Sequence, residues 1–202
     1  MNPVFSDIYP LDECYAARGM ALPEIRAVGA AELPDPYQAL LAHEGDMTSR
    51  LENYHQGRIH IHLLGRRTTE NEYFREVTLL LQKDGTPVEY GAIKIMTELF
   101  PEEARREIFE EKQPLGKILT RHGVAFQSQP RTFLRLRADD FINGALQLAG
   151  APFLFGRRNT LLDPWSRPLA EIVEILPPCA PLPRPAGVPS SRSASLQSSD
   201  SR

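Results

Sequence analysis

The sequence predicts an α+β fold in which helices pack on one face of an antiparallel β-sheet. Several segments alternate apolar with polar residues at a period of two, which is the pattern of half-buried strands. These segments come in runs and do not alternate regularly with helices, and this order favours an antiparallel sheet. A chain of 202 residues with 42% apolar residues has room for one ordinary hydrophobic core.

The first predicted elements are two short helices and a strand. A helix begins at Asp35-Pro36, because aspartate is a common cap residue and proline fits the first helical turn. A second helical stretch covers Met47–Tyr54 and ends before Gly57. The residues Arg58–Leu63 then alternate polar with apolar, so the sheet is expected to start there.

A β-hairpin and a charged helix follow. The strands Glu72–Lys83 and Val88–Met96 are joined through Asp84-Gly85, a dipeptide typical of tight hairpin turns. Pro101 opens a helix with acidic residues in its first turn, where they interact favourably with the helix dipole.

The remaining predicted elements are three strands and a helix. The strands cover Phe133–Arg137, Phe153–Leu162 and Pro168–Leu176, and the helix covers Asp139–Leu148. They complete a domain at residues 34–178. Residues 1–33 are predicted to form a loosely packed arm, because Ala, Gly and Pro interrupt every element there. Residues 179–202 are rich in proline and serine and are predicted to form a disordered tail.

Composition excludes several classes of function. The net charge of −3 lacks the basic excess that nucleic-acid binding requires, so no nucleic-acid partner is expected. No apolar run approaches the about 20 residues of a membrane span, and the N-terminus lacks a signal-peptide pattern. We therefore expect a cytoplasmic protein with no membrane partner. Cys14 and Cys179 lie far apart, which indicates free thiols.

Arg75 is the most informative single residue. On a strand it shares a face with Val77, Leu79 and Leu81, so its guanidinium belongs to the face expected to be buried. A buried arginine needs an anion. That anion is either an internal carboxylate, or a carboxylate ligand held by the planar fork of the guanidinium; an edge position with an exposed head group is a further alternative.

Two glutamates on the last strand are candidate acids. Glu174 shares a side with Ala170 and Ile172, whereas Glu171 shares the other side with Val173. Alternation does not decide which of them faces inward. A carboxyl group among apolar neighbours could act as a general acid or bind a ligand hydroxyl, and two solvated strand residues are the alternative.

Other polar residues give weaker signals. One of Arg157 and Arg158, which must point to opposite faces of a strand, could reach a site. Arg135 and Arg137 fit a solvated sheet surface. The pair His60 and His62 has no third metal ligand at a suitable spacing, so exposed histidines are expected there. The motifs of dinucleotide-binding folds, P-loops, serine hydrolases and zinc peptidases are absent from the sequence, and no cofactor or metal is implied.

Five short motifs occur in an order that resembles the chorismate pyruvate-lyase family. The resemblance covers about residues 35–178, nearly the whole predicted domain. The motifs are Asp46–Glu52, Tyr73–Val77 before the Asp-Gly hairpin, Pro114–Leu119, Phe155–Arg158, and Pro168-Leu169 with Glu174 ahead of Pro178.

This resemblance implies a fold, an activity and a set of site residues. The family encloses its ligand between an antiparallel sheet and helical flaps, and it releases pyruvate from chorismate to leave 4-hydroxybenzoate without metal or cofactor. By the match, Arg75 holds the ring carboxylate, and the backbone amides of Met47 and Leu115 also bind it. Glu174 contacts the ring hydroxyl, and Arg157 is a further candidate contact.

The chain departs from the family in the strand after the hairpin. Members of the ubiquinone pathway usually have Gly-Arg-Thr there, whereas this chain has Gly91-Ala92-Ile93. Lys94 points to the same face as Ala92, which makes it the candidate substitute for the missing arginine. The variation resembles the divergent branch of the family, which includes actinobacterial 4-hydroxybenzoate synthases.

The sequence thus predicts a monomeric, cofactor-independent lyase whose small-molecule partner is chorismate. Two alternatives stay open. One is a non-catalytic sensor domain of the same fold that binds a small aromatic carboxylate, as in the effector-binding domains of some transcription regulators. The other is a structural domain in which Arg75 pairs internally.

Overall fold

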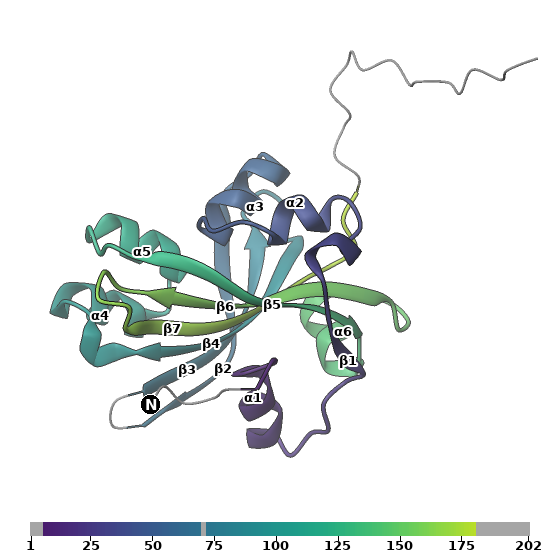
Figure 1. The fold of residues 1–202 in the computed structure, drawn as a ribbon, viewed down its shortest axis with the longest axis horizontal. Coiled ribbons are helices and arrows are strands. Elements are labelled where there is room, and N and C mark those ends of the chain that lie inside the picture. The colour runs from purple at the N-terminus through teal and green to yellow at the C-terminus, as the bar shows by residue number, and fades with distance from the viewer. Residues whose placement is uncertain (1–5, 70–71, 181–202) are drawn as a thin grey trace, which may run out of the picture.

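A seven-stranded antiparallel sheet forms the centre of the computed structural model, which describes residues 6–69 and 72–180 (Figure 1). The strands lie side by side in the order β1-β5-β6-β7-β4-β3-β2. The predicted α+β class with an antiparallel sheet is confirmed. The strands are β1 (Ile25–Val28), β2 (Ile59–Thr68), β3 (Glu72–Leu81), β4 (Pro87–Met96), β5 (Gln127–Arg137), β6 (Phe153–Leu162) and β7 (Pro168–Leu176).

The sheet consists of two meanders joined by one strand pairing. Strands β2, β3 and β4 are neighbours both in sequence and in space, and so are β5, β6 and β7. The pairing of β4 with β7 joins the two meanders, and it places Gly91 opposite Glu174 and Ile93 opposite Ile172. We call this β4–β7 pairing the seam.

Six α-helices surround the sheet within the described residues. Asp46 caps α3, because its side chain accepts a hydrogen bond from the Ser49 amide at 2.8 Å, and Asp139 caps α6 in the same way. The helices are α1 (Leu11–Ala17), α2 (Tyr37–Leu41), α3 (Met47–His55), α4 (Glu102–Glu110), α5 (Leu115–Arg121) and α6 (Asp140–Leu146), with short 3₁₀ turns η1 (Ala30–Glu32) and η2 (Thr97–Leu99).

The helices cover both faces of the sheet, whereas the sequence predicted one covered face. Side chains from α2, α3, α4 and α5 form one core with the first face, which we call the cavity face. Side chains from α1 and α6 form a second core with the opposite face, the back face (Figure 1). The physical reason lies in the central strands. On β4, Tyr90 and Ala92 are buried toward the back face and Ile95 toward the cavity face, so both faces need cover.

Residues 6–33, the described part of the predicted N-terminal arm (residues 1–33), are part of the fold and not loosely packed. Leu11 and Tyr15 of α1 are fully buried, and the Tyr15 hydroxyl donates a hydrogen bond to Asp139 at 2.9 Å. Strand β1 pairs with β5, with Ala27 opposite Leu134. Proline and glycine limit these elements to a few residues, but long-range partners hold them in place.

The C-terminal residues that the structure describes contact the helices of the cavity face. The Cys179 amide donates to the Tyr37 hydroxyl at 3.0 Å, and the Tyr54 hydroxyl donates to the carbonyl of Ala180. The rest of the predicted tail, residues 181–202, lies outside the described residues. Among the residues described, the search for helices long and apolar enough to cross a membrane found none.

Most predicted element limits agree with the structure; beyond the N-terminal elements, the exceptions are β2, β5 and α5. Strand β2 continues to Thr68, whereas the sequence predicted a strand over Arg58–Leu63. Strands β6 and β7 have the predicted limits, and the hairpin turn places Gly85 at φ +72°. Strand β5 begins at Gln127 and not at Phe133, and α5, which follows Pro114, was not predicted.

Candidate functional site

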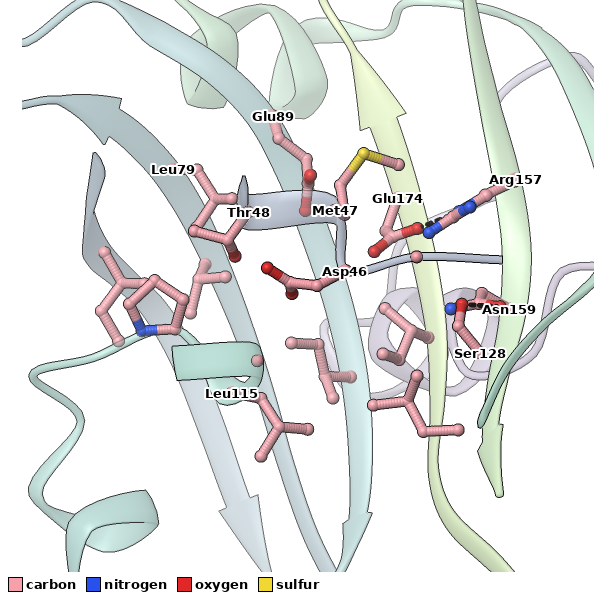
Figure 2. A pocket seen from close by; sticks show the side chains of 18 of the residues that line it. Asp46, Met47, Thr48, Leu79, Glu89, Leu115, Ser128, Arg157, Asn159 and Glu174 are labelled. Carbon is pink, nitrogen blue, oxygen red and sulfur yellow. Dashed lines mark hydrogen bonds and ion pairs between the residues drawn. The ribbon is translucent and has the colours of Figure 1, made fainter. Parts of the chain in front are cut away.

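A cavity of about 50 Å³ lies between the cavity face of the sheet and the N-terminal ends of α3 and α5. Its floor comes from both meanders: β3 and β4 on one side of the seam, β6 and β7 on the other. Figure 2 shows the carboxyl groups of Asp46, Glu89 and Glu174 around this space, with Met47 and Thr48 above it. The small volume restricts the site to a small ligand.

Arg75 lies in the cavity wall as a buried guanidinium without a carboxylate partner in the described chain. The residue is 1% exposed, and its only hydrogen bond to a described residue is a long contact of 3.5 Å to the Gln113 carbonyl. The Nε and Nη1 atoms have no partner among the described residues. Glu111, the nearest acid that affects it, is already bound to Tyr73 and Arg66. The internal salt bridge considered from the sequence is therefore not formed.

Burial has an electrostatic consequence for Arg75. Desolvation lowers the pKa of its guanidinium, because the charged form loses its hydration and gains no counter-ion. A bound anion would supply the missing counter-ion and could accept hydrogen bonds from the guanidinium nitrogens that lack partners. The wall at Arg75 is thus suited to a carboxylate.

Glu174 and Arg157 form a buried ion pair on the other side of the seam. They are directly opposite each other on β7 and β6, and the Arg157 Nε donates to the Glu174 carboxylate. Arg157 also donates to the backbone carbonyls of Leu41, at 3.0 Å, and of His43, at 2.8 Å. Glu174 therefore faces the cavity, with one fully buried cation beside it.

His43 adds no positive charge to this region at neutral pH. Burial and the neighbouring Arg157 lower the pKa of its imidazole to about 4. The ring accepts a hydrogen bond from the Gly45 amide through Nδ1 at 3.0 Å. It therefore serves to shape the loop between α2 and α3.

Glu89 is a cavity residue that the sequence analysis did not single out. It is 4% exposed, and the described residues offer no ion pair or hydrogen bond to its Oε2 atom. Burial, and next the charge of Glu174, raise the pKa of Glu89 well above its usual range. The sequence contains a signal for this residue. Glu89 lies within a strand segment, and the residues two and four positions later on the same side, Gly91 and Ile93, are not charged.

The roof of the cavity depends on a close contact between α3 and α5. A Cβ atom added to Gly116 would lie 1.9 Å from the Asp46 Oδ1, so only glycine fits at this position. Met47 and Leu115, the two residues expected to present backbone amides, line the cavity at the first turns of these helices. The structure thus brings together Arg75, Glu174, Arg157, Met47 and Leu115.

Lys94 does not belong to this group, which corrects the prediction that it replaces the missing arginine. Its Nζ lies 2.6 Å from a Glu72 carboxylate oxygen and 5.3 Å from the centre of the Tyr9 ring. The reason is strand alternation: Glu89 and Ile93 line the cavity, so Lys94, next to Ile93, points away from it. Its face was predicted correctly relative to Ala92, but that face is the back face.

The other charged candidates have structural partners on the sheet. Glu171 accepts from Arg158 at 3.1 Å and from the Thr160 hydroxyl at 2.9 Å, on the opposite side of β7 from Glu174. Arg135 stacks on the ring of Phe153 at 3.5 Å from its centre, and Arg137 stacks on the same ring.

The histidines and cysteines form no metal site within the part of the chain that the structure describes. His60 is half-buried and His62 is exposed on the edge strand β2, and no cluster of three metal-binding side chains occurs among the described residues. Cys14 and Cys179 are both free thiols.

Comparison with known proteins gives one distant relative in sequence and several similar structures. No model of a known protein family matches the chain. A protein of Methanocaldococcus jannaschii named "Putative lyase MJ0807" is 25% identical over 113 residues, which are 54% of this chain and 60% of that protein. The matched part thus spans less than two thirds of the archaeal relative.

The similar structures agree in fold over most of the chain. PhnF from Mycobacterium smegmatis superposes with a TM-score of 0.53 and 13% identity, over 84% of this chain and 94% of that chain. The effector domain of PhnF from the same organism gives a TM-score of 0.50 and 14% identity, over 65% of this chain and 88% of that chain. The fold is α+β and chorismate lyase-like, as the sequence predicted.

Proposed function

We propose that the cavity binds a small carboxylate and that Arg75 holds the carboxylate group. The observation that carries the proposal is a fully buried guanidinium with two N–H groups lacking partners in the described chain. Burying an arginine without an anion costs free energy, and a bound ligand with an anionic group would offset this cost. The planar fork fits a carboxylate better than a lysine would.

We further propose that this ligand is chorismate and that the protein releases pyruvate from it to give 4-hydroxybenzoate. The five motifs in family order support this proposal, as does the lyase named in the archaeal relative. Arg75 would hold the ring carboxylate, with the amides of Met47 and Leu115 beside it. Glu174 would receive the ring hydroxyl.

The chemistry required of such a site is modest. The ring loses its enolpyruvyl ether and one hydrogen, and it becomes aromatic, so the reaction is strongly downhill. A carboxylate clamp, an enclosed acid and exclusion of water suffice to position the substrate and to move its protons.

A second candidate function is a non-catalytic sensor for a small aromatic carboxylate. Two observations favour it. The fold is similar to that of the PhnF effector domain, and Lys94, the candidate substitute for the missing family arginine, points to the back face and pairs with Glu72. A sensor would need the Arg75 clamp but no acid that transfers a proton.

One experiment separates these functions. Purified protein is incubated with chorismate while 4-hydroxybenzoate and pyruvate are measured, and binding of 4-hydroxybenzoate is measured by calorimetry. A lyase forms both products in equal amounts. A sensor binds the aromatic carboxylate without turnover. If neither chorismate nor 4-hydroxybenzoate is bound, the carboxylate proposal is wrong.

A further inference from the structure

We propose that Glu89 is a second acid of the cavity, held in its neutral form, whose O–H group binds an oxygen atom of the ligand next to the hydroxyl group at Glu174. The proposal extends the proposed function and rests on it for the identity of the ligand. It specifies a ligand class: ring carboxylates that carry two neighbouring oxygen substituents at the end away from the carboxylate.

The backbone of β4 places Glu89 against the cavity. The register between β3 and β4 shifts so that Leu79 faces Glu89 while Leu80 faces Pro87, which leaves Val88 as an extra residue directly before Glu89. Such bulges change the direction of neighbouring side chains and are frequent beside active sites. Gly91 keeps the adjacent space open, because a Cβ there would lie 3.3 Å from the Glu89 Oε1.

The charges around Glu89 oppose its ionisation. Glu174, across the seam, and Asp46, at the start of α3, both oppose a negative charge on Glu89. Figure 2 shows the three carboxyl groups around the cavity. Among the described residues, Arg157 is the cation whose charge lowers the pKa of Glu89. Its guanidinium is already held by Glu174 and two backbone carbonyls. Leu79 of β3 supplies only an apolar contact surface. An ionised Glu89 would thus be buried beside a carboxylate with no cation of its own.

A neutral Glu89 carries a proton that nothing in the described chain accepts. Its Oε2 atom is buried and has no hydrogen-bond partner among these residues. An apolar residue of similar size would fill the site at less cost, because it leaves no polar group unsatisfied. The unmatched donor is therefore suited to an acceptor on a ligand.

The positions of Glu174 and Glu89 along the seam determine which ligand atom accepts the hydrogen bond from Glu89. Glu174 lies opposite Gly91, and Glu89 is two residues before Gly91 on the same face, so the two carboxyl groups are diagonal neighbours. A ligand hydroxyl that donates to the Glu174 carboxyl group brings the next ring substituent to Glu89. In chorismate that substituent is the ether oxygen of the enolpyruvyl group.

In the lyase reaction Glu89 would give its proton to this ether oxygen. The bond between the ring carbon and the oxygen breaks, and its electron pair stays on the oxygen, which leaves as enolpyruvate and tautomerises to pyruvate. The ring carbon that carries the hydroxyl loses its hydrogen as a proton to Glu174, and the electrons of that bond complete the aromatic ring. Transfer of the proton from Glu174 to Glu89 restores both groups.

The first test does not require turnover. Infrared difference spectra at neutral pH compare the wild type with Glu89→Gln, and calorimetry compares 4-hydroxybenzoate with 3,4-dihydroxybenzoate as probes. The wild type should show a protonated carboxylic acid band that the variant lacks. It should prefer the dihydroxy probe by roughly 3- to 10-fold, the value of one neutral hydrogen bond. Glu89→Leu should lose this preference.

The second test uses chorismate. Glu89→Gln should lower kcat by roughly 10²- to 10⁴-fold with little change in KM, because the amide hydrogen-bonds but transfers no proton. Wild-type activity should fall as pH rises through the raised pKa of Glu89, since the proton is then lost. Glu171→Gln, a buried carboxyl on the back face, is the control and should retain the wild-type kcat and probe preference.

The outcomes separate this inference from the proposed function. If the wild type does not consume chorismate, the lyase proposal fails, and the infrared band and the probe preference still decide the role of Glu89. An acid band that persists in Glu89→Gln, or a probe preference unchanged in Glu89→Leu, would overturn the inference. So would full turnover by Glu89→Gln.

Discussion

The two faces of the sheet bury charged residues in different ways. On the back face the buried charges have partners. Glu76 accepts from Arg18 at 2.7 Å and from the Tyr90 hydroxyl at 2.6 Å, and Glu171 accepts from Arg158 at 3.1 Å. Both carboxylates have partners within the described chain, so a structural role explains them.

On the cavity face two buried charged residues have no ion-pair partner among the described residues, whereas Arg157, whose Nη2 atom also lacks a hydrogen-bond partner there, is paired with Glu174. Arg75 has two N–H groups without partners, and Glu89 has a carboxyl oxygen without one, within the chain segments described. Both are as deeply buried as Glu76 and Glu171. The comparison shows that the lack of an ion-pair partner among the described residues, and not burial itself, separates Arg75 and Glu89 from the structural charges.

The largest expected effect tests the clamp. Arg75→Ala should abolish binding of 4-hydroxybenzoate in calorimetry while the melting temperature is unchanged or higher, because the change removes a buried charge that lacks a counter-ion. Arg75→Lys should restore little binding, since an ammonium group lacks the planar fork.

Arg158→Ala on the back face is the matched variant. It should keep binding and lower the melting temperature, because Glu171 loses a partner. If Arg75→Ala unfolds the protein and the wild type binds no carboxylate, the contrast between the faces has no functional meaning.

The next largest effect compares the two glutamates of β7. Glu174→Gln should reduce turnover of chorismate by roughly 10²- to 10⁴-fold, the usual effect of losing a positioned acid or base, while Glu171→Gln is nearly silent. Steady-state kinetics measure both variants.

The structure adds an expected loss of stability for the first variant. The Arg157 guanidinium would lose its counter-ion in a fully buried position, which typically costs about 3–5 kcal/mol. Denaturant unfolding measures this loss. The opposite result, with turnover lost only in Glu171→Gln, would mean that the substrate binds on the back face.

A smaller effect concerns the roof of the cavity. Gly116→Ala would force a Cβ against Asp46 and separate α3 from α5, so we expect weaker ligand binding and a stability loss of about 1–3 kcal/mol. Gly144→Ala in α6 is the control, because nothing lies within 4 Å of the added Cβ. It should stabilise by about 0.5–1 kcal/mol and leave binding unchanged. Equal binding by both variants would show that the contact of α3 with α5 does not shape the site.

The smallest effect on ligand binding is expected for the hydrogen-bonded network of the back face. Tyr90→Phe removes the hydroxyl that donates to Glu76, which should lower the free energy of unfolding by about 1.5–3 kcal/mol, the range for hydrogen bonds to charged groups. Ligand affinity should be unchanged in calorimetry. A drop in affinity similar to that of Arg75→Ala would show that ligand binding depends on the back-face network as well as on the cavity face.

Local patterns were sufficient to predict much of the fold and part of the candidate site. Alternation gave the limits of β6 and β7, and Asp84-Gly85 gave the hairpin between β3 and β4. The same alternation placed Arg75 on a buried face, where the structure has it. These signals depend on neighbouring residues alone, so the sequence shows them directly.

The features that were missed depend on contacts that are distant in sequence. The elements α1 and β1, labelled in Figure 1, are held in place by Asp139 and by β5. Asp139 lies more than 100 positions after its partner Tyr15 in the sequence. Glu89 could not be predicted as a cavity residue, because both faces of β4 are buried and the strand shows no clear alternation of apolar with polar residues. The bulge at Val88 also shifts the register of Glu89 relative to β3. Lys94 was assigned to the site because alternation relates neighbours to one another but does not say which face carries the cavity.

The seam has a consequence for how the chain folds. Each meander can form through local turns, but the β4–β7 pairing joins segments that about 70 residues separate, and such non-local pairing is the slow part of folding in sheet proteins. The same step buries Glu89 beside Glu174, and the raised pKa of Glu89 means that it takes up a proton as it is buried. Refolding near neutral pH is therefore coupled to proton uptake, and stopped-flow measurements should show faster refolding in mildly acidic buffer.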